Sequence, residues 1–165
     1  MLHGGLHLFE KKNENKNTIL ELHFEDDSGL ALTDWQRMAT PTLNPEPRDA
    51  PDALSKKMTS AFLKQQLYST RSTIKNLLLD QHIVRGIGNA YADEILWNAG
   101  ISPFSVSNKI PADKITILAN SIKKVLTLAE KQILKTHPDI IRGEVRDFLL
   151  IHHQKKQTAL RGQPS

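Results

Sequence analysis

The first forty residues alternate between apolar and polar positions, as β-strands with one buried face do. The alternation falls into three segments, residues 6–9, 18–24 and 30–33, which polar turn-forming residues separate. This arrangement predicts an antiparallel meander or hairpins. Three strands make a thin sheet, so we expect this part of the chain to be the remainder of a larger β domain.

Prolines dominate the next stretch, residues 41–54, which holds Pro41, Pro45, Pro47 and Pro51. Proline restricts φ and has no backbone N–H to donate, so it disfavours both helix and central strand. We therefore expect an extended linker between two domains.

From residue 55 onward apolar residues recur every three or four positions, which is the spacing of amphipathic helices. The expected helix starts carry a capping residue or a proline: Ser55, Ser72 or Thr73, Asn89 and Pro111. Gly100 and Pro103 are expected to end the helix that opens at Asn89. Gly143 and the apolar residues 148–151 predict a turn and a last strand-like segment. The fold class expected from these patterns is α+β.

Composition narrows the class of protein. The chain has 165 residues, of which 39% are hydrophobic, and this suits one medium domain or two small ones with a packed core. It contains no cysteine, which excludes disulfides and cysteine-ligated zinc and is consistent with a reducing cytoplasm. No apolar run approaches the length of a membrane span, and the first residues do not form a secretory signal. We expect a cytoplasmic monomer that does not associate with membranes.

Charge is distributed unevenly along the chain. Residues 1–54 carry 10 acidic and 5 basic side chains, a net of −5, whereas residues 55–165 carry 8 and 17, a net of +9. A basic C-terminal two-thirds is what a nucleic-acid-binding module needs, because phosphate contacts dominate non-specific affinity for DNA. A solvated lysine-rich face with no partner is the alternative.

The sequence Gly86-Ile87-Gly88-Asn89 lies between two expected helices. A helix start presents unpaired N–H groups with a partial positive charge, which suits a phosphate oxygen. A dinucleotide fingerprint would need glycine or alanine at position 91, where Tyr91 stands. A helix-hairpin-helix DNA clamp, or glycines that merely let two helices pack closely, are the other readings.

Three longer matches carry a resemblance to a known family: Lys75 to Gln81, Gly86 to Leu96, and Ala99-Gly100-Ile101 with Pro103. They resemble the helix-two-turn-helix segment of the formamidopyrimidine-DNA glycosylase and endonuclease VIII family. The resemblance implies that Lys75, Asn89 and the turn backbone, including Gly86 and Gly88, contact DNA phosphates that flank a lesion. It also implies that Asp80 and Glu94 hold the shape of the motif, and that Arg85 adds a phosphate contact or is solvated.

Residues 34–39 resemble the Asp-Pro-Arg-Arg-Phe-Gly loop of the same family, which holds a void-filling wedge. By this match Arg37 contacts the DNA backbone and Met38 takes the place of the aromatic wedge. Gln36 replaces the arginine that reads the orphaned base, which puts the opposite-base preference in doubt. Ordinary core packing is the alternative for Met38. Leu2 or His3 stands near the family's other wedge position.

The departures from the family concern catalysis. The family's nucleophile is the amine of an N-terminal proline followed by a catalytic glutamate, and this sequence begins Met1-Leu2 and contains no Met-Pro-Glu. The family's C-terminal finger would begin about where this sequence stops. We therefore expect a chain truncated at both ends, with no catalytic residue assigned and enzymatic activity left open.

No metal or cofactor site is expected. On a strand, the adjacent His152 and His153 would face opposite ways. His3 and His7 lie in strand-like sequence, and residues 25–27 form a solvated acidic turn.

The combined interpretation divides the chain into four parts. Residues 1–40 are the C-terminal part of the catalytic β-sandwich domain, 41–54 the linker, 55–153 the helix-two-turn-helix domain, and 154–165 a polar tail. The resemblance implies a bifunctional DNA glycosylase and AP lyase of base-excision repair, of which this chain retains the part that binds the backbone of damaged or abasic double-stranded DNA. A non-catalytic DNA-binding module or a degenerate paralogue is the alternative.

Overall fold

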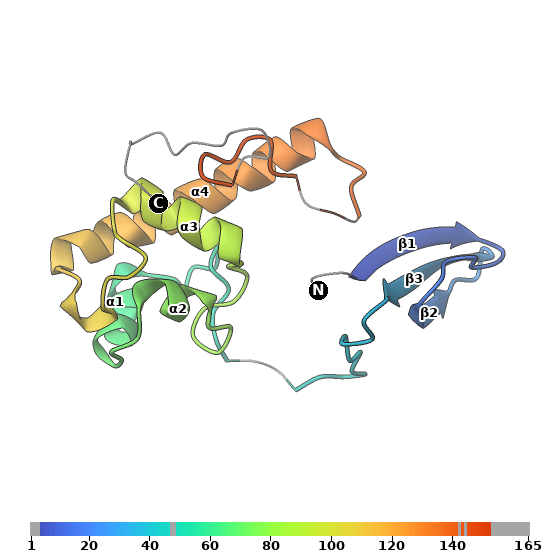
Figure 1. The fold of residues 1–165 in the computed structure, drawn as a ribbon, viewed down its shortest axis with the longest axis horizontal. Helices are drawn as coiled ribbons and strands as arrows, with labels where there is room; N and C mark the ends of the chain where they lie inside the picture. Colours follow the sequence, from blue (N-terminus) through green and yellow to red (C-terminus); the bar gives the residue numbers. More distant parts are fainter. Residues whose placement is uncertain (1–3, 47–48, 142, 144, 153–165) are drawn as a thin grey trace. The chain divides into compact units, whose positions relative to one another are not determined.

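The computed structural model describes residues 4–46, 49–141, 143 and 145–152. The chain divides into two compact units (Figure 1). One comprises Met1–Pro47 with His137–Glu144 and contains the strands, and the other comprises Arg48–Thr136 with Val145–Ser165 and contains the helices. The expected α+β class is confirmed. The helical unit begins inside the stretch that the sequence analysis treats as linker.

The strands are β1 (Gly4–Glu10), β2 (Thr18–His23) and β3 (Ser28–Asp34), and they form one antiparallel sheet in the order β1-β3-β2. The expected meander is therefore wrong in its order, since only β2 and β3 form a hairpin. β1 pairs with β3 and not with β2, its neighbour in sequence. Alternation of apolar residues fixes the faces of strands but not which strands pair.

The register of the sheet places leucines together on one face. Leu6 and Leu20 both pair with Leu32, while Leu8 and Leu22 both pair with Leu30. Leu8 is 65% exposed. This leucine face consists of Leu6, Leu8, Leu20, Leu22, Leu30 and Leu32.

The opposite face of the sheet is packed around Phe9. Its ring lies edge-on to that of His23, with 5.3 Å between centroids. It also covers Gly29, where an added Cβ would come within 2.2 Å of the Phe9 ring. Glycine is therefore required at this position by close packing.

The helical unit contains α1 (Ser60–Tyr68), α2 (Ile74–Leu79), α3 (Asn89–Ala99), a 3-10 turn (Ser107–Lys109) and α4 (Ala112–Thr136) (Figure 1). One apolar core joins them, because the periodic apolar residues of each helix point inward. Its largest fully buried members include Met58, Leu63, Leu67, Ile74, Leu78, Ile95, Leu118 and Ile122.

Helix ends follow local capping chemistry. Thr73 caps α2 by accepting the N–H of Asn76, and Gly100 ends α3 in the left-handed conformation at φ 64°. The expected cap at Ser55 is wrong, because α1 begins at Ser60 and Thr59 caps it through the N–H of Phe62. Ser55 instead belongs to a preceding turn, in which its N–H donates to the carbonyl of Asp52 at 3.0 Å.

The strand-like segment expected at residues 148–151 is also wrong. Those residues form a turn of the helical unit in which Leu149 is 4% exposed. An apolar run of four residues is compatible with either a strand or a buried turn. Contacts with α3, described below, decide between them.

Candidate nucleic-acid interface

Two successive turns connect α2 to α3, and Asp80 organises the first. Its N–H closes the end of α2 by donating to the carbonyls of Asn76 and Leu77. Its own carbonyl accepts the N–H groups of Ile83 and Val84, at 2.9 and 3.0 Å. Asp80 thereby satisfies two carbonyls at the end of α2 and continues the chain into the next turn.

Gln81 organises the second turn. Its Oε1 accepts the N–H of Gly86 at 3.0 Å, while its Nε2 donates to the carbonyls of Ile87 and Leu79, at 3.0 and 3.2 Å. One side-chain amide therefore fastens both ends of the turn. The sequence analysis includes Gln81 in the family match but assigns it no role.

The two glycines of the turn serve different purposes. Gly86 has φ 89°, a conformation that side chains other than glycine rarely adopt. Gly88 has the unstrained φ of −98° and stands at the N-cap of α3. Among the described residues, no atom lies within 4 Å of where a Cβ on Gly88 would be.

The beginning of α3 is open to an anion. Gly88, the N-cap residue, has no side chain and so makes no capping hydrogen bond there. Asn89 is the first residue of the helix and is exposed. The N–H groups of the first turn of a helix lack intrahelical acceptors, so the geometry suits a phosphate oxygen.

Arg85 holds the start of the helical unit against this turn. Its Nε donates to the carbonyl of Ala50 at 2.8 Å, and its N–H to that of Pro51 at 2.9 Å. The N–H of Ala53 returns a bond to the carbonyl of Arg85 at 3.0 Å. Arg85 is thus hydrogen-bonded to residues 50–53. We expected from the sequence either a phosphate contact or a solvated side chain, and neither expectation includes these bonds.

Lys75 lies in the first turn of α2 and is paired with Asp93 of α3. Its Nζ is 2.8 Å from Oδ1 and 2.9 Å from Oδ2 of that carboxylate. The Lys75 side chain keeps 28% of its surface exposed, so it is paired with Asp93 but only partly buried. The sequence analysis assigns no role to Asp93.

Glu94 is 5% exposed and anchors the segment that follows α4. Its Oε2 accepts the N–H of Leu150 at 3.1 Å, and its Oε1 accepts those of Ile151 and His152 at 2.6 and 3.1 Å. A buried carboxylate needs such donors, and here backbone amides supply all three. This anchoring explains why residues 148–151 do not form a strand.

The second candidate region is the loop after β3, in the strand unit. Asp34, 4% exposed, accepts three loop N–H groups: those of Gln36, Met38 and Ala39, at 3.1, 3.0 and 2.8 Å. Arg37 has φ 52°. Met38 is 75% exposed, so the alternative that it packs in a core is wrong. Leu2 and His3 lie outside the described residues.

Comparison with known proteins identifies the family. The sequence profile of the formamidopyrimidine-DNA glycosylase H2TH domain matches residues 50–137, which is more than half of the chain. The chain belongs to the formamidopyrimidine-DNA glycosylase family. The match spans the helical unit from the segment that Arg85 holds to the end of α4.

Relatives within the glycosylase family extend the similarity. The formamidopyrimidine-DNA glycosylase of Lactobacillus acidophilus is 38% identical over 165 aligned residues, which cover 89% of this chain and 58% of the relative. That of Lactobacillus helveticus is 46% identical over 77 residues, covering 47% of this chain and 28% of the relative. The chain thus spans between about a quarter and three-fifths of the length of these relatives.

Solved structures of the glycosylase family share the fold. The Lactococcus lactis Fpg in complex with DNA containing an abasic site superposes with a TM-score of 0.67 at 26% identity, covering 79% of this chain and 51% of that one. MutM in complex with DNA containing carbocyclic 8-oxo-G gives 0.69 at 26% identity, with 79% and 52% covered.

The described part of this glycosylase-family chain brings together most of the residues expected in the helical unit. Gly86, Gly88 and Asn89 form the turn and helix start, and Asp80 is bonded to the backbone of the preceding turn, whereas Glu94 is bonded to residues 150–152 of the segment after α4. Within residues 4–46, 49–141, 143 and 145–152, no group of histidine, aspartate and glutamate side chains could hold a metal ion. No helix in those ranges is long and apolar enough to cross a membrane.

Proposed function

We propose that this chain binds the sugar–phosphate backbone of double-stranded DNA through the open start of α3 and the ammonium of Lys75. It would act as the backbone-gripping part of a base-excision-repair protein of the formamidopyrimidine-DNA glycosylase type. The observation that carries the proposal is the uncapped, exposed helix start at Gly88 and Asn89. We also propose that the chain is a cytoplasmic monomer, and the bacterial origin of its relatives supports the cytoplasmic location.

Electrostatics supports the helix start as a phosphate site. The first turn of α3 carries no acidic residue that would neutralise its partial positive charge. A phosphate oxygen would accept from the N–H groups of Gly88 and Asn89, and the Asn89 side chain could donate a further bond. Backbone donors read no base, so this contact would be indifferent to sequence.

The loop at residues 34–39 supports a role at damaged rather than intact DNA. Asp34 holds the loop so that Met38 projects with most of its surface exposed. An apolar side chain of this kind can fill the void that an extruded base leaves in a duplex. We propose Met38 as this wedge and Arg37 as a neighbouring backbone contact.

The second candidate function is DNA binding without catalysis. The sequence contains no Met-Pro-Glu, and we assign no residue of this chain to glycosidic-bond cleavage or β-elimination. The residues described above would grip DNA in either case. We propose glycosylase and AP lyase activity on damaged bases only for a protein of this family of which the chain forms one part. None of the side chains described above is proposed to catalyse it.

Salt-dependent binding tests the proposal. Fluorescence anisotropy with a labelled duplex would give the affinity of the 165-residue chain at several salt concentrations. If Lys75 contacts a phosphate, Lys75→Ala weakens binding to every duplex and lowers the log–log salt slope by about one. Lys64→Ala is the matched control, because Lys64 also has a local partner, the Tyr68 ring at 5.8 Å. Equal slopes for wild type and Lys75→Ala would refute the assignment.

A further inference from the structure

Three ionisable side chains from three separate segments meet at Asp93. Lys75 of α2 approaches both carboxylate oxygens, at 2.8 and 2.9 Å. His152, from the segment after α4, places its Nε2 at 2.8 Å from Oδ2. The side chains of Asp93 and His152 are 18% and 27% exposed, so the cluster is partly shielded from solvent but still reachable.

Hydrogen bonds to Glu94 hold the backbone at His152 in place. Its own N–H donates to Oε1 of Glu94 at 3.1 Å, next to the bonds that Glu94 receives from Leu150 and Ile151. Glu94 and Asp93 are adjacent on α3, so one residue fixes the backbone of His152 and the other receives its ring. Glu94 therefore fixes the point from which the His152 ring reaches Asp93.

The protons in this cluster can be assigned from chemistry. An ionised carboxylate only accepts hydrogen bonds, so Nε2 of His152 carries a hydrogen in both the neutral and the charged ring. The ammonium of Lys75 has three N–H donors. Bonds to the two oxygens of Asp93 use two of them, which leaves one for a further acceptor.

The net charge of the cluster depends on the histidine ring. With His152 neutral, Lys75 and Asp93 sum to zero; with the ring protonated, the cluster carries a charge of +1. Histidine is the side chain that ordinarily changes charge between pH 5 and 8. Among the described residues, the charged groups around the Leu150–His152 segment include Glu94, which already receives three backbone N–H groups, and Lys124, which lines the same groove as Glu94 and Leu150.

We infer that Asp93 is a positioning residue for Lys75 and that protonation of His152 strengthens the hold of Lys75 on a DNA phosphate. This inference rests on the proposed function. Asp93 keeps the long lysine side chain in one place, but its negative charge competes with the phosphate for the ammonium. A protonated His152 takes up part of that charge through Oδ2, which frees Lys75 toward the phosphate.

The test is the pH profile of DNA binding. Duplex affinity of the full 165-residue chain is measured at constant ionic strength between about pH 5.5 and 8.5, for wild type, His152→Asn, Asp93→Asn and the double variant. Each variant is first checked for an unchanged cooperative melt. His23→Asn is the matched control, because His23 is also paired with a carboxylate, Glu21 at 3.1 Å, but belongs to the strand unit.

We expect wild type to bind more tightly at the acidic end, and His152→Asn to remove about two- to fivefold of that difference, the range of a partly exposed ion pair. Asp93→Asn should lose the same part of the profile, and the double variant should lose no more. His23→Asn should keep it. A His152→Asn profile that matches wild type, or additive effects of the two substitutions, would overturn the inference alone. Absence of DNA binding at every pH would overturn the proposed function and the inference with it.

Discussion

The side-chain amide of Gln81 accepts the N–H of Gly86 at 3.0 Å and so closes the turn that leads into α3. No backbone carbonyl takes this bond among the residues that the structure describes. The N–H of Gly86 therefore depends on the Gln81 side chain, and the contribution of this bond to the turn can be tested at Gln81.

Replacing Gln81 by alanine should loosen the turn. It leaves the N–H of Gly86 and the carbonyl of Ile87 without their partner, at a cost of about 1–3 kcal/mol if water does not replace it. Thermal melting would show the lost stability, and duplex binding should weaken with no change in sequence preference. Gln65→Ala, on the exposed side of α1, is the control and should melt as wild type does.

Gly88→Ser should separate stability from binding. A serine at an N-cap accepts an N–H of the first turn, so α3 should gain about a few tenths of a kcal/mol in stability relative to glycine. The same hydroxyl would occupy the proposed phosphate site, and duplex affinity should fall about fivefold, the worth of one hydrogen bond. Melting curves and anisotropy on the same samples would show the opposite signs.

The companion substitution Gly86→Ser has a different expected result. Its positive φ of 89° strains any side chain, and an added Cβ would lie 3.3 Å from Oδ2 of Asp52. Stability and binding should therefore fall together. If Gly88→Ser behaved in the same way as Gly86→Ser, the helix start would be only structural.

Met38→Ala should reduce the preference for an abasic duplex over an intact one. The side chain is 75% exposed, so its loss should leave the melting temperature nearly unchanged. Competition binding with the two duplexes would measure the preference. Equal weakening on both duplexes would show that Met38 contributes contact area but fills no void.

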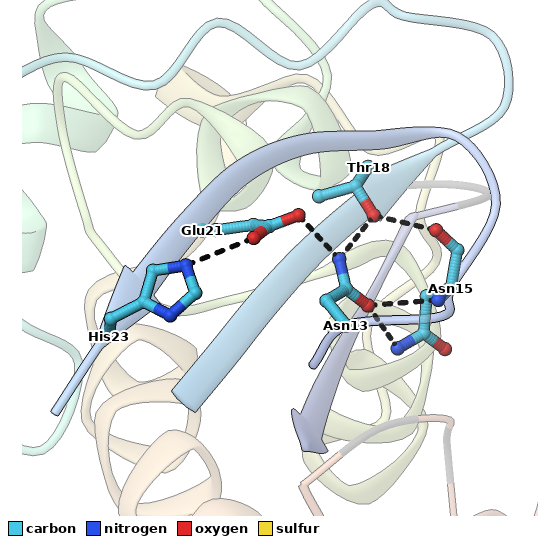
Figure 2. A network of polar contacts seen from close by, with 5 residues as sticks. All are labelled: Asn13, Asn15, Thr18, Glu21 and His23. Atoms are coloured by element: carbon cyan, nitrogen blue, oxygen red, sulfur yellow. Dashed lines mark hydrogen bonds and ion pairs between the residues drawn. The ribbon is translucent and has the colours of Figure 1, made fainter. Parts of the chain in front are cut away.

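Glu21 lies in a polar network on the strand unit (Figure 2). The hydrogen bond from Asn13 Nδ2, at 2.7 Å, is the main cause that holds the pKa of Glu21 below its ordinary value of 4.5, and His23 lowers it further. Asn13→Ala should raise the pKa of Glu21. Carbon-detected NMR titration of the carboxyl group would measure the change.

The sign of the linkage follows from this lowered pKa. Glu21 contributes stability at pH values above its unfolded-state pKa, and the contribution disappears as pH falls through the lower folded-state pKa. Asn13→Ala should therefore flatten the acid limb of the stability curve. Asn15→Ala is the control: Asn15 donates to Oδ1 of Asn13 at 2.7 Å and leaves the Asn13–Glu21 bond in place.

Local chemistry made much of this fold predictable from sequence. The three strands follow from alternation, and α3 (Asn89–Ala99) follows from the glycines that flank it, Gly88 and Gly100. The sequence led us to expect Ser55 as the cap of the first helix, whereas Thr59, another small hydroxyl residue four positions later, is the cap in the structure. The order β1-β3-β2 depends on pairing between distant segments, which alternation does not encode.

The candidate site likewise has features that the sequence predicts and features that it does not. The sequence points to Gly86, Gly88 and Asn89 because a glycine turn before a helix has a direct physical meaning. It gives no sign of the partnership of Asp93 with His152, which are 59 positions apart and meet only because Glu94 holds the backbone of residues 150–152. Hydrogen bonds between side chains of remote segments produce no periodic pattern in the sequence.

The hydrogen bonds between Arg85 and residues 50–53 also have a mechanical consequence. The segment that enters the helical unit, residues 50–53, is joined to the turn before α3 by three hydrogen bonds of 2.8 to 3.0 Å. A force on the chain N-terminal to Ala50 therefore acts on that turn before it acts on any helix. If DNA is held there, tension in the linker and grip on the duplex act at the same point of the molecule.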